Sequence, residues 1–182
     1  HLQPNTSLAN AVFAGWYSLQ QSTIEVRNLG TAGNGFSAKN VVDLDEGLGV
    51  AQRVYVVPDQ NYQLRVPFAP NPLDDRERRF TVSFGGRLLD TIAVPRSTTI
   101  SWSTRTYTVR SESPLATVEL QDLSGGFEGA LLDGISLTGP VPEQEFKPFA
   151  HVGNAGIYSA RRGKVVVFRL DFFGDPARAP VE

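Results

Sequence analysis

The feature that most constrains the fold is a two-residue alternation of apolar and polar side chains in short segments. Within residues 61–69, apolar side chains stand at every second position, at Tyr62, Leu64, Val66 and Phe68. The same period recurs at Phe80, Val82 and Phe84. Successive side chains of an extended chain point to opposite faces, so each segment predicts a strand with one buried face. Several such strands must cover their apolar faces with a second sheet, which predicts an all-β antiparallel β-sandwich.

Turn residues separate the expected strands, which are Thr23–Arg27, Asn40–Asp45, Val50–Val57, Asn61–Ala69, Arg78–Phe84, Arg87–Ala93, Thr99–Ser103, Thr106–Arg110, Leu115–Gln121 and Leu131–Leu137. The pair Gly85-Gly86 predicts a two-residue hairpin, because paired glycines accept the positive φ angles of such turns. No segment keeps a 3.6-residue apolar period, so no long helix is expected. The charged segment Asn71–Arg78 is interpreted as an exposed loop with solvated charges.

Composition narrows the classes of function. The 182 residues suit one domain with a small appendage, and the net charge of −2 gives no electrostatic basis for binding nucleic acid. No apolar run approaches the roughly 20 residues that cross a bilayer, so membrane insertion is not expected. The chain has no cysteine, which excludes disulfides, thiolate metal sites and cysteine nucleophiles.

The chain is expected to divide near residue 139. Residues 1–139 would form the sandwich, and Pro140–Pro148 resembles a linker in composition. Beyond it, Lys164–Phe173 predicts one further strand. A lone strand is not stable in water, so 140–182 is expected to pack on the domain or on a neighbouring chain. The second arrangement would make an oligomer or a larger assembly.

Several motifs follow one another in an order that is typical of a known family. They are Gly15-Trp16, Asn40–Asp45 with Val50–Val54, Pro58–Leu64, Trp102–Val109 and Leu131–Leu137. Over roughly residues 10–139 the chain resembles the galactose-binding-like jelly-roll carbohydrate-binding modules of bacterial extracellular and plant cell-wall proteins. The resemblance implies a jelly roll that binds carbohydrate without catalysis. Related modules hold a structural calcium near the closing acidic residue, so it also implies calcium at Asp133.

A sugar offers an apolar ring face, which an aromatic side chain can cover, and a rim of hydroxyl groups, which need polar partners. The candidate carbohydrate-binding residues are the aromatic Trp16, Tyr17 and Trp102 and the polar Asn40, Asp43, Arg65 and Arg79. An arginine could also clamp an acidic polysaccharide. The alternatives are that the tryptophans belong to the core and that the arginines are ordinary surface residues.

The expected role is non-catalytic attachment of an extracellular or particle-borne assembly to a cell-surface polysaccharide. This places the protein outside the cell, at a cell surface or on a virion-like particle. The alternative is a structural module of a spike or tail that mainly packs against other chains. A glycosidase is a further alternative, because Asp43 and Asp45 share a strand face about 7 Å apart and such enzymes need two nearby carboxylates.

Overall fold

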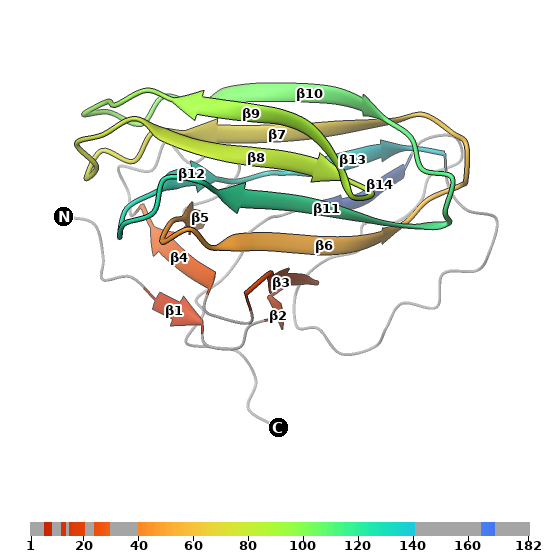
Figure 1. Ribbon diagram of the computed structural model, residues 1–182, viewed down its shortest axis with the longest axis horizontal. Helices are drawn as coiled ribbons and strands as arrows, with labels where there is room; N and C mark the ends of the chain where they lie inside the picture. The colour runs from red at the N-terminus through yellow and green to blue at the C-terminus, as the bar shows by residue number, and fades with distance from the viewer. Residues whose placement is uncertain are drawn as a thin grey trace.

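The computed structural model describes residues 6–8, 12–13, 15–20, 24–29, 40–140 and 165–169. Two antiparallel sheets pack face to face (Figure 1). Followed from each strand to a hydrogen-bonded neighbour, sheet A contains β1 (Thr6–Leu8), β4 (Ile24–Asn28), β5 (Asn40–Leu44), β12 (Ala130–Leu132), β7 (Tyr62–Ala69), β13 (Ser136–Gly139) and β14 (Val165–Arg169). A further strand, β10 (Ser103–Val109), pairs with the other edge of β7. The predicted all-β sandwich is confirmed.

Sheet B contains, in spatial order, β2 (Val12–Phe13), β3 (Trp16–Ser18), β6 (Gly49–Tyr55), β11 (Leu115–Asp122), β8 (Arg78–Phe84) and β9 (Arg87–Val94). Its hairpin at Gly85-Gly86 is confirmed, with φ angles of 58° and 78°. Among the described residues there is no helix, and hence none long and apolar enough to cross a membrane.

The core lies between the two sheets and follows the alternation of the sequence. Tyr62, Leu64 and Val66 of β7 are fully buried, whereas Gln63 and Arg65 between them are exposed. Two aromatic rings join the layers. Phe68 of β7 and Phe80 of β8 meet edge to face, with their centroids 5.7 Å apart.

Two predicted strands differ from the observed ones. Residues 99–102 are not a strand, and β10 begins only at Ser103. The predicted strand Leu131–Leu137 is broken into β12 and β13, which lie end to end along β7. Between them, 133–135 stand opposite the two residues Val66 and Pro67, which is a β-bulge. Pro67 has no N–H for the ladder, and Gly134 takes a φ of 62°.

The backbone of β14 pairs antiparallel with β13. Residues 141–164 and 170–182 lie outside the described residues. The division into a domain at 1–139 and a separate region at 140–182 therefore stays a prediction.

Four connections meet at one end of the sandwich, which we call the loop end: 45–48, 70–77, 95–102 and 123–129. It lies at the left in Figure 1. Backbone hydrogen bonds tie these connections together. Glu46 N donates to Gly126 O at 2.7 Å, and Gly47 N donates to the carboxylate of Asp122 at 2.8 Å. Asp122 also accepts from Gly125 N at 2.8 Å, so this buried carboxylate fixes two of the four loops.

Candidate functional site

Three carboxylates meet on the outer face of sheet A at the loop end. Glu25 of β4 is the cross-strand partner of Asp43 of β5, and Asp45 follows two residues later on the same face. One carboxylate oxygen from each lies within 4.8 Å of the others. Asp43 and Asp45 are only 3% and 4% exposed. We call these three residues the acidic cluster.

One buried arginine stands in the acidic cluster. Arg27 is 2% exposed, and its Nε lies 2.5 Å from Asp43 Oδ2 and 3.3 Å from Glu25 Oε1. Its Nη2 lies 2.5 Å from Oε2 of Glu128, a residue of the 123–129 connection. A single guanidinium therefore faces Asp43, Glu25 and Glu128, and Asp45 adds a further carboxylate nearby. When Glu25, Asp43, Asp45 and Glu128 are all ionised, the single positive charge of Arg27 balances only one of them. Buried charges are stable when they are balanced, so this arrangement is unfavourable without further positive charge or protonation.

Two further donors fix Asp43. Asn71 Nδ2 donates to Asp43 Oδ2 at 2.9 Å and also to Glu128 Oε2 at 2.8 Å. The backbone amide of Gly129 donates to Asp43 Oδ1 at 2.8 Å. A Cβ on Gly129 would stand 1.8 Å from the carbonyl oxygen of Leu44, so only glycine fits at this position. Loops 70–77 and 123–129 thus each donate a hydrogen bond to Asp43 of the acidic cluster.

Burial makes the two aspartates weak acids. It raises the pKa of Asp43 to about 7, although the Arg27 guanidinium and the Gly129 amide lower that pKa. Burial also raises the pKa of Asp45 to about 8, and the neighbouring carboxylates, Asp43 first, add to the rise. Both pKa values rise mainly because burial penalises the ionised carboxylate, and the neighbouring carboxylates add to the rise. A proton or a metal cation can supply the balance.

The residues of the acidic cluster fit a hard metal cation. All its ligand atoms are carboxylate oxygens, the type that calcium and magnesium prefer. Glu25 Oε1 is buried and accepts no hydrogen bond from the described residues, and its charged neighbour is Arg27 Nε at 3.3 Å. The resemblance implied calcium at Asp133. Asp133 is fully buried and is not a member of this cluster, so calcium at Asp133 stays a prediction, and the candidate ligands that the structure brings together are Glu25, Asp43 and Asp45.

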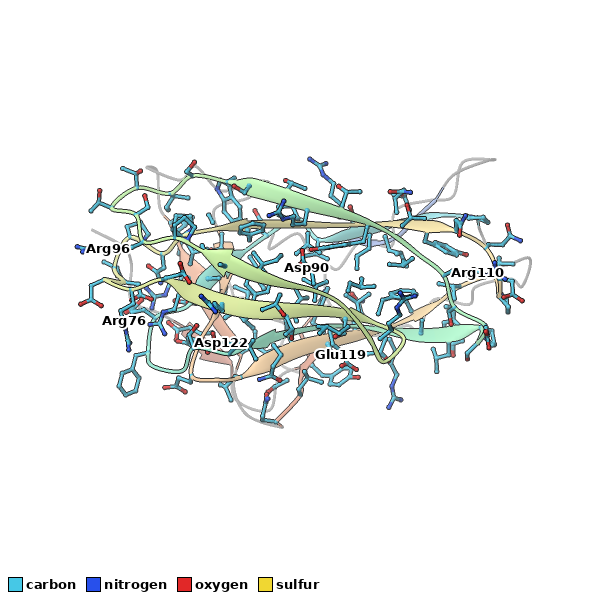
Figure 2. All side chains as sticks on the ribbon, turned by 45° about the horizontal axis from the view of Figure 1, so that its top comes forward. Arg76, Asp90, Arg96, Arg110, Glu119 and Asp122 are labelled. Atoms are coloured by element: carbon cyan, nitrogen blue, oxygen red, sulfur yellow. The ribbon has the colours of Figure 1, made fainter. Side chains whose placement is uncertain are left out.

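A shallow depression lies beside the acidic cluster at the loop end. Its lining residues come from three connections and the adjoining strand ends: Pro70, Asn71, Asp74, Arg76, Arg78, Val94, Pro95, Arg96 and Gly129. Asn71 and Gly129 belong both to this lining and to the contacts of Asp43. The depression and the acidic cluster therefore share one framework. Figure 2 shows Arg76 and Arg96 at this end and Arg110 at the opposite end.

The charged segment that the sequence predicted to be solvated is only partly so. Asp74 and Arg78 are 8% and 4% exposed and form an ion pair with each other. Arg78 also donates to the carbonyl of Gly125 across the loop end. Arg76 is exposed, and its side chain is 61% accessible. The loop is thus anchored by a buried ion pair and presents an exposed arginine.

The 123–129 connection, which borders the depression through Gly129, carries an exposed aromatic side chain. Phe127 is 78% exposed, the highest fraction among the large apolar side chains that the structure describes. The adjacent Gly126 approaches Arg76 so closely that a Cβ would lie 2.7 Å from Arg76 Nη2. Sequence reasoning did not select Phe127. The available signal was a bulky aromatic directly after Gly125-Gly126 in a turn, where no strand alternation would bury it.

Three of the predicted sugar-binding residues are inside the protein. Trp16 is 2% exposed and belongs to the core cluster, as the alternative interpretation of the tryptophans stated. Asn40 is 6% exposed, and Asp43 is held in the acidic cluster. All three are nearly sealed from solvent in this structure, and their part in sugar binding stays a prediction.

The other four predicted residues lie on two opposite surfaces. Tyr17 and Arg79 are on the outer face of sheet B, and the Arg79 side chain pairs with Glu77 at 3.0 Å. Arg65 is exposed on the outer face of sheet A, where Trp102 packs partly buried against a second apolar cluster. The sandwich separates these two pairs, so the structure does not bring the predicted residues into one site. Their part in binding stays a prediction.

The fold has counterparts among solved structures. The carbohydrate-binding module TmCBM61, solved in complex with β-1,4-galactotriose, aligns with a TM-score of 0.51 at 14% identity, over 69% of this chain and 88% of that one. A family 35 carbohydrate-binding module from an environmental isolate has a TM-score of 0.46 at 16% identity, over 76% of this chain and 86% of that one. The C-terminal family 6 module of the laminarinase LamC from the marine Zobellia galactanivorans has a TM-score of 0.47 at 17% identity, over 74% and 98%. The predicted resemblance to galactose-binding-like carbohydrate-binding modules is confirmed at the level of the fold.

Neither a protein-family model nor a curated protein matches the chain. At these identities the solved structures describe the fold alone.

Proposed function

We propose that the protein binds a glycan at its loop end without acting on it chemically. The observation that carries the proposal is Phe127, 78% exposed in the 123–129 connection, whose Gly129 lines the depression. An exposed phenyl ring is costly in water, and the apolar face of a sugar ring can cover it. Arg76 and Arg96 offer planar groups of donors for the hydroxyl rim. A module with the same fold was solved with a galactose trisaccharide, which agrees with this use of the sandwich.

Binding without catalysis is supported by the position of the carboxylates. Asp43 and Asp45 are the pair that a glycosidase would have used, and they do share one face of the chain. Both are nearly sealed, and Asp43 is engaged by Arg27, Asn71 and Gly129. A general acid must reach the glycosidic oxygen. These two residues cannot do so from their buried positions.

We further propose that the cation of the acidic cluster is calcium, with Glu25, Asp43 and Asp45 as protein ligands. Calcium accepts six to eight oxygen ligands in flexible geometry, and carboxylates can each supply one or two. When bound, the ion would supply the positive charge that Arg27 alone does not. Its role would be structural, because Asn71 and Gly129 connect the cluster to the depression.

In its wider role, the module would attach an extracellular or particle-borne assembly to a cell-surface polysaccharide. The protein would then work outside the cell, at a cell surface or on a virion-like particle. The C-terminal region would serve the assembly contact. Of this region the structure describes β14, whose backbone pairs with β13 of the same sheet, so the assembly contact would involve the sandwich as well.

A glycan array on the purified chain, with calcium and with a chelator, tests the proposal. Phe127→Ala should abolish binding without changing the melting temperature, because the ring is exposed. Tyr55→Ala is the matched control, since Tyr55 is also an exposed aromatic, 43% accessible, on the outer face of sheet B. Equal binding by both variants, or no binding of any glycan by the parent protein, would contradict the proposal.

A further inference from the structure

The lining of the depression carries more positive than negative side chains, in contrast to the acidic cluster beside it and to the chain as a whole. Three arginines, Arg76, Arg78 and Arg96, line it against one aspartate, Asp74, whereas the net charge of the protein is −2. Local concentrations of one sign at a low-dielectric surface attract ligands of the opposite sign. Whether the depression attracts an anion depends on which of these arginines are already neutralised by nearby carboxylates.

The buried arginine is satisfied within the protein. Arg78 pairs with Asp74 and donates to the carbonyl of Gly125. This pair forms the floor of the depression and contributes no net charge. The nearby Glu128 is likewise engaged, by Arg27 and Asn71. Both carboxylates thus have closer partners than the exposed arginines Arg76 and Arg96, and Asp74 Oδ1 lies 3.9 Å from Arg76 Nε.

The two exposed arginines of the lining, Arg76 and Arg96, remain available to a ligand, and we call them the rim arginines. No hydrogen bond or ion pair joins the Arg96 side chain to any other residue that the structure describes. Arg76 Nε lies 3.9 Å from Asp74 and 3.7 Å from Asp75, beyond hydrogen-bonding distance in both cases. The Asp75 side chain is 82% exposed, so water screens that pair. The rim thus presents two guanidinium groups to solvent.

We infer that the loop end recognises an anionic glycan, with Arg96 and Arg76 binding a uronate carboxylate or a sulfate ester. This inference rests on the proposed function and names the substrate class of the same site. A guanidinium matches either anion with two parallel hydrogen bonds. The depression has no interior space that would admit a water molecule, so the anion would meet the two guanidinium groups at the surface. Phe127, outside the depression, would cover an adjacent sugar ring.

The test compares four polymers on the full chain by affinity electrophoresis or titration calorimetry. Polygalacturonate carries carboxylates, dextran sulfate carries sulfates, and fully methyl-esterified pectin and dextran are their neutral counterparts. We expect one of the two anionic polymers to bind at least about tenfold more tightly than its neutral counterpart. The affinity should fall with added salt, because exposed charges are screened. The anionic polymer that binds identifies the source of the anion.

Arg96→Gln and Arg76→Gln should each reduce binding of the anionic polymer about tenfold, with an unchanged melting temperature. Arg87→Gln is the matched control, because Arg87 is an exposed arginine in the hairpin at the other end of sheet B. Tight binding of neutral glycans that Phe127→Ala abolishes but Arg96→Gln and Arg76→Gln leave unchanged would overturn the inference and leave the proposed function standing. Binding of no polymer and no array glycan would remove both.

Discussion

The side-chain amide of Asn71 lies 2.9 Å from Asp43 Oδ2, and this hydrogen bond joins the depression to the acidic cluster. The same nitrogen reaches Glu128 at 2.8 Å, while Asn71 Oδ1 accepts from Leu73 N at 3.1 Å. One buried residue therefore orders the start of the 70–77 loop and two carboxylates at once. Because Asn71 also lines the depression, a change in the charge of the acidic cluster would alter the hydrogen bonds that hold this residue there.

Asn71→Ala should lower the free energy of unfolding by about 1–3 kcal/mol, because Asp43 and Glu128 each lose a buried donor. Urea denaturation with the parent chain as reference measures the loss. Asn61→Ala is the matched control: Asn61 is exposed, and its replacement should change stability by less than about 0.5 kcal/mol. Equal stabilities of the two variants would show that Asn71 does not have this role.

The acidic cluster predicts that stability falls as pH rises when no metal is present. The folded pKa values of Asp43 and Asp45, about 7 and about 8, are raised above the ordinary value of 3.8. Between these limits the folded state binds more protons than the unfolded state, so the stabilisation present at low pH is lost as pH rises through the folded pKa values. In chelator, the melting temperature should fall by about 5–10 °C from pH 5.5 to pH 8.5.

Calcium should reverse that fall, raising the melting temperature at pH 8.5 and much less at pH 5.5, where protons occupy the carboxylates. Asp45→Asn removes one titrating group and one ligand, so it should flatten the pH profile and weaken the response to calcium. Thermal melts of both proteins in chelator and in calcium measure these effects. A flat profile for the parent chain in chelator, or an identical calcium response in the variant, would contradict the assignment.

The sequence predicts the strands well because the signal is local. Alternation at Tyr62–Phe68 and Phe80–Phe84 depends only on each segment's own side chains, and the observed strands match it. The break between β12 and β13 is different in kind. It depends on Pro67 lying opposite 133–135, and that pairing joins residues far apart in the chain. Alternation cannot show which strand lies opposite.

The candidate site likewise has some features that follow from local sequence and others that depend on the pairing of distant strands. A shared face for Asp43 and Asp45 follows from strand geometry and is observed. Membership of Glu25 depends on the register between β4 and β5, which no local pattern encodes. For Trp16 the sequence leaves two possibilities, because an aromatic residue in a strand can lie in the core or on the surface. The position of the facing sheet decides between them, and here it buries Trp16 in the core. Phe127 lies in a turn, where alternation gives no information on exposure.

The last prediction concerns Gly129, the residue that brings the 123–129 connection against β5. Its amide donates to Asp43 at 2.8 Å, and an added Cβ would stand 1.8 Å from Leu44 O and 2.8 Å from Asp45 N. Both neighbours are backbone atoms and cannot rotate away. Gly129→Ala must therefore displace the connection, break the hydrogen bond to Asp43 and misplace the adjacent Phe127.

We expect Gly129→Ala to cost at least about 3 kcal/mol of stability, in line with severe overpacking, and to abolish glycan binding and the calcium response together. Gly85→Ala is the control, since Gly85 has a φ of 58° but open space around it, so only backbone strain of about 1 kcal/mol applies. Urea denaturation and the glycan array measure both variants. A Gly129→Ala protein as stable as the Gly85→Ala protein, with binding intact, would show that the loop end does not depend on this close approach.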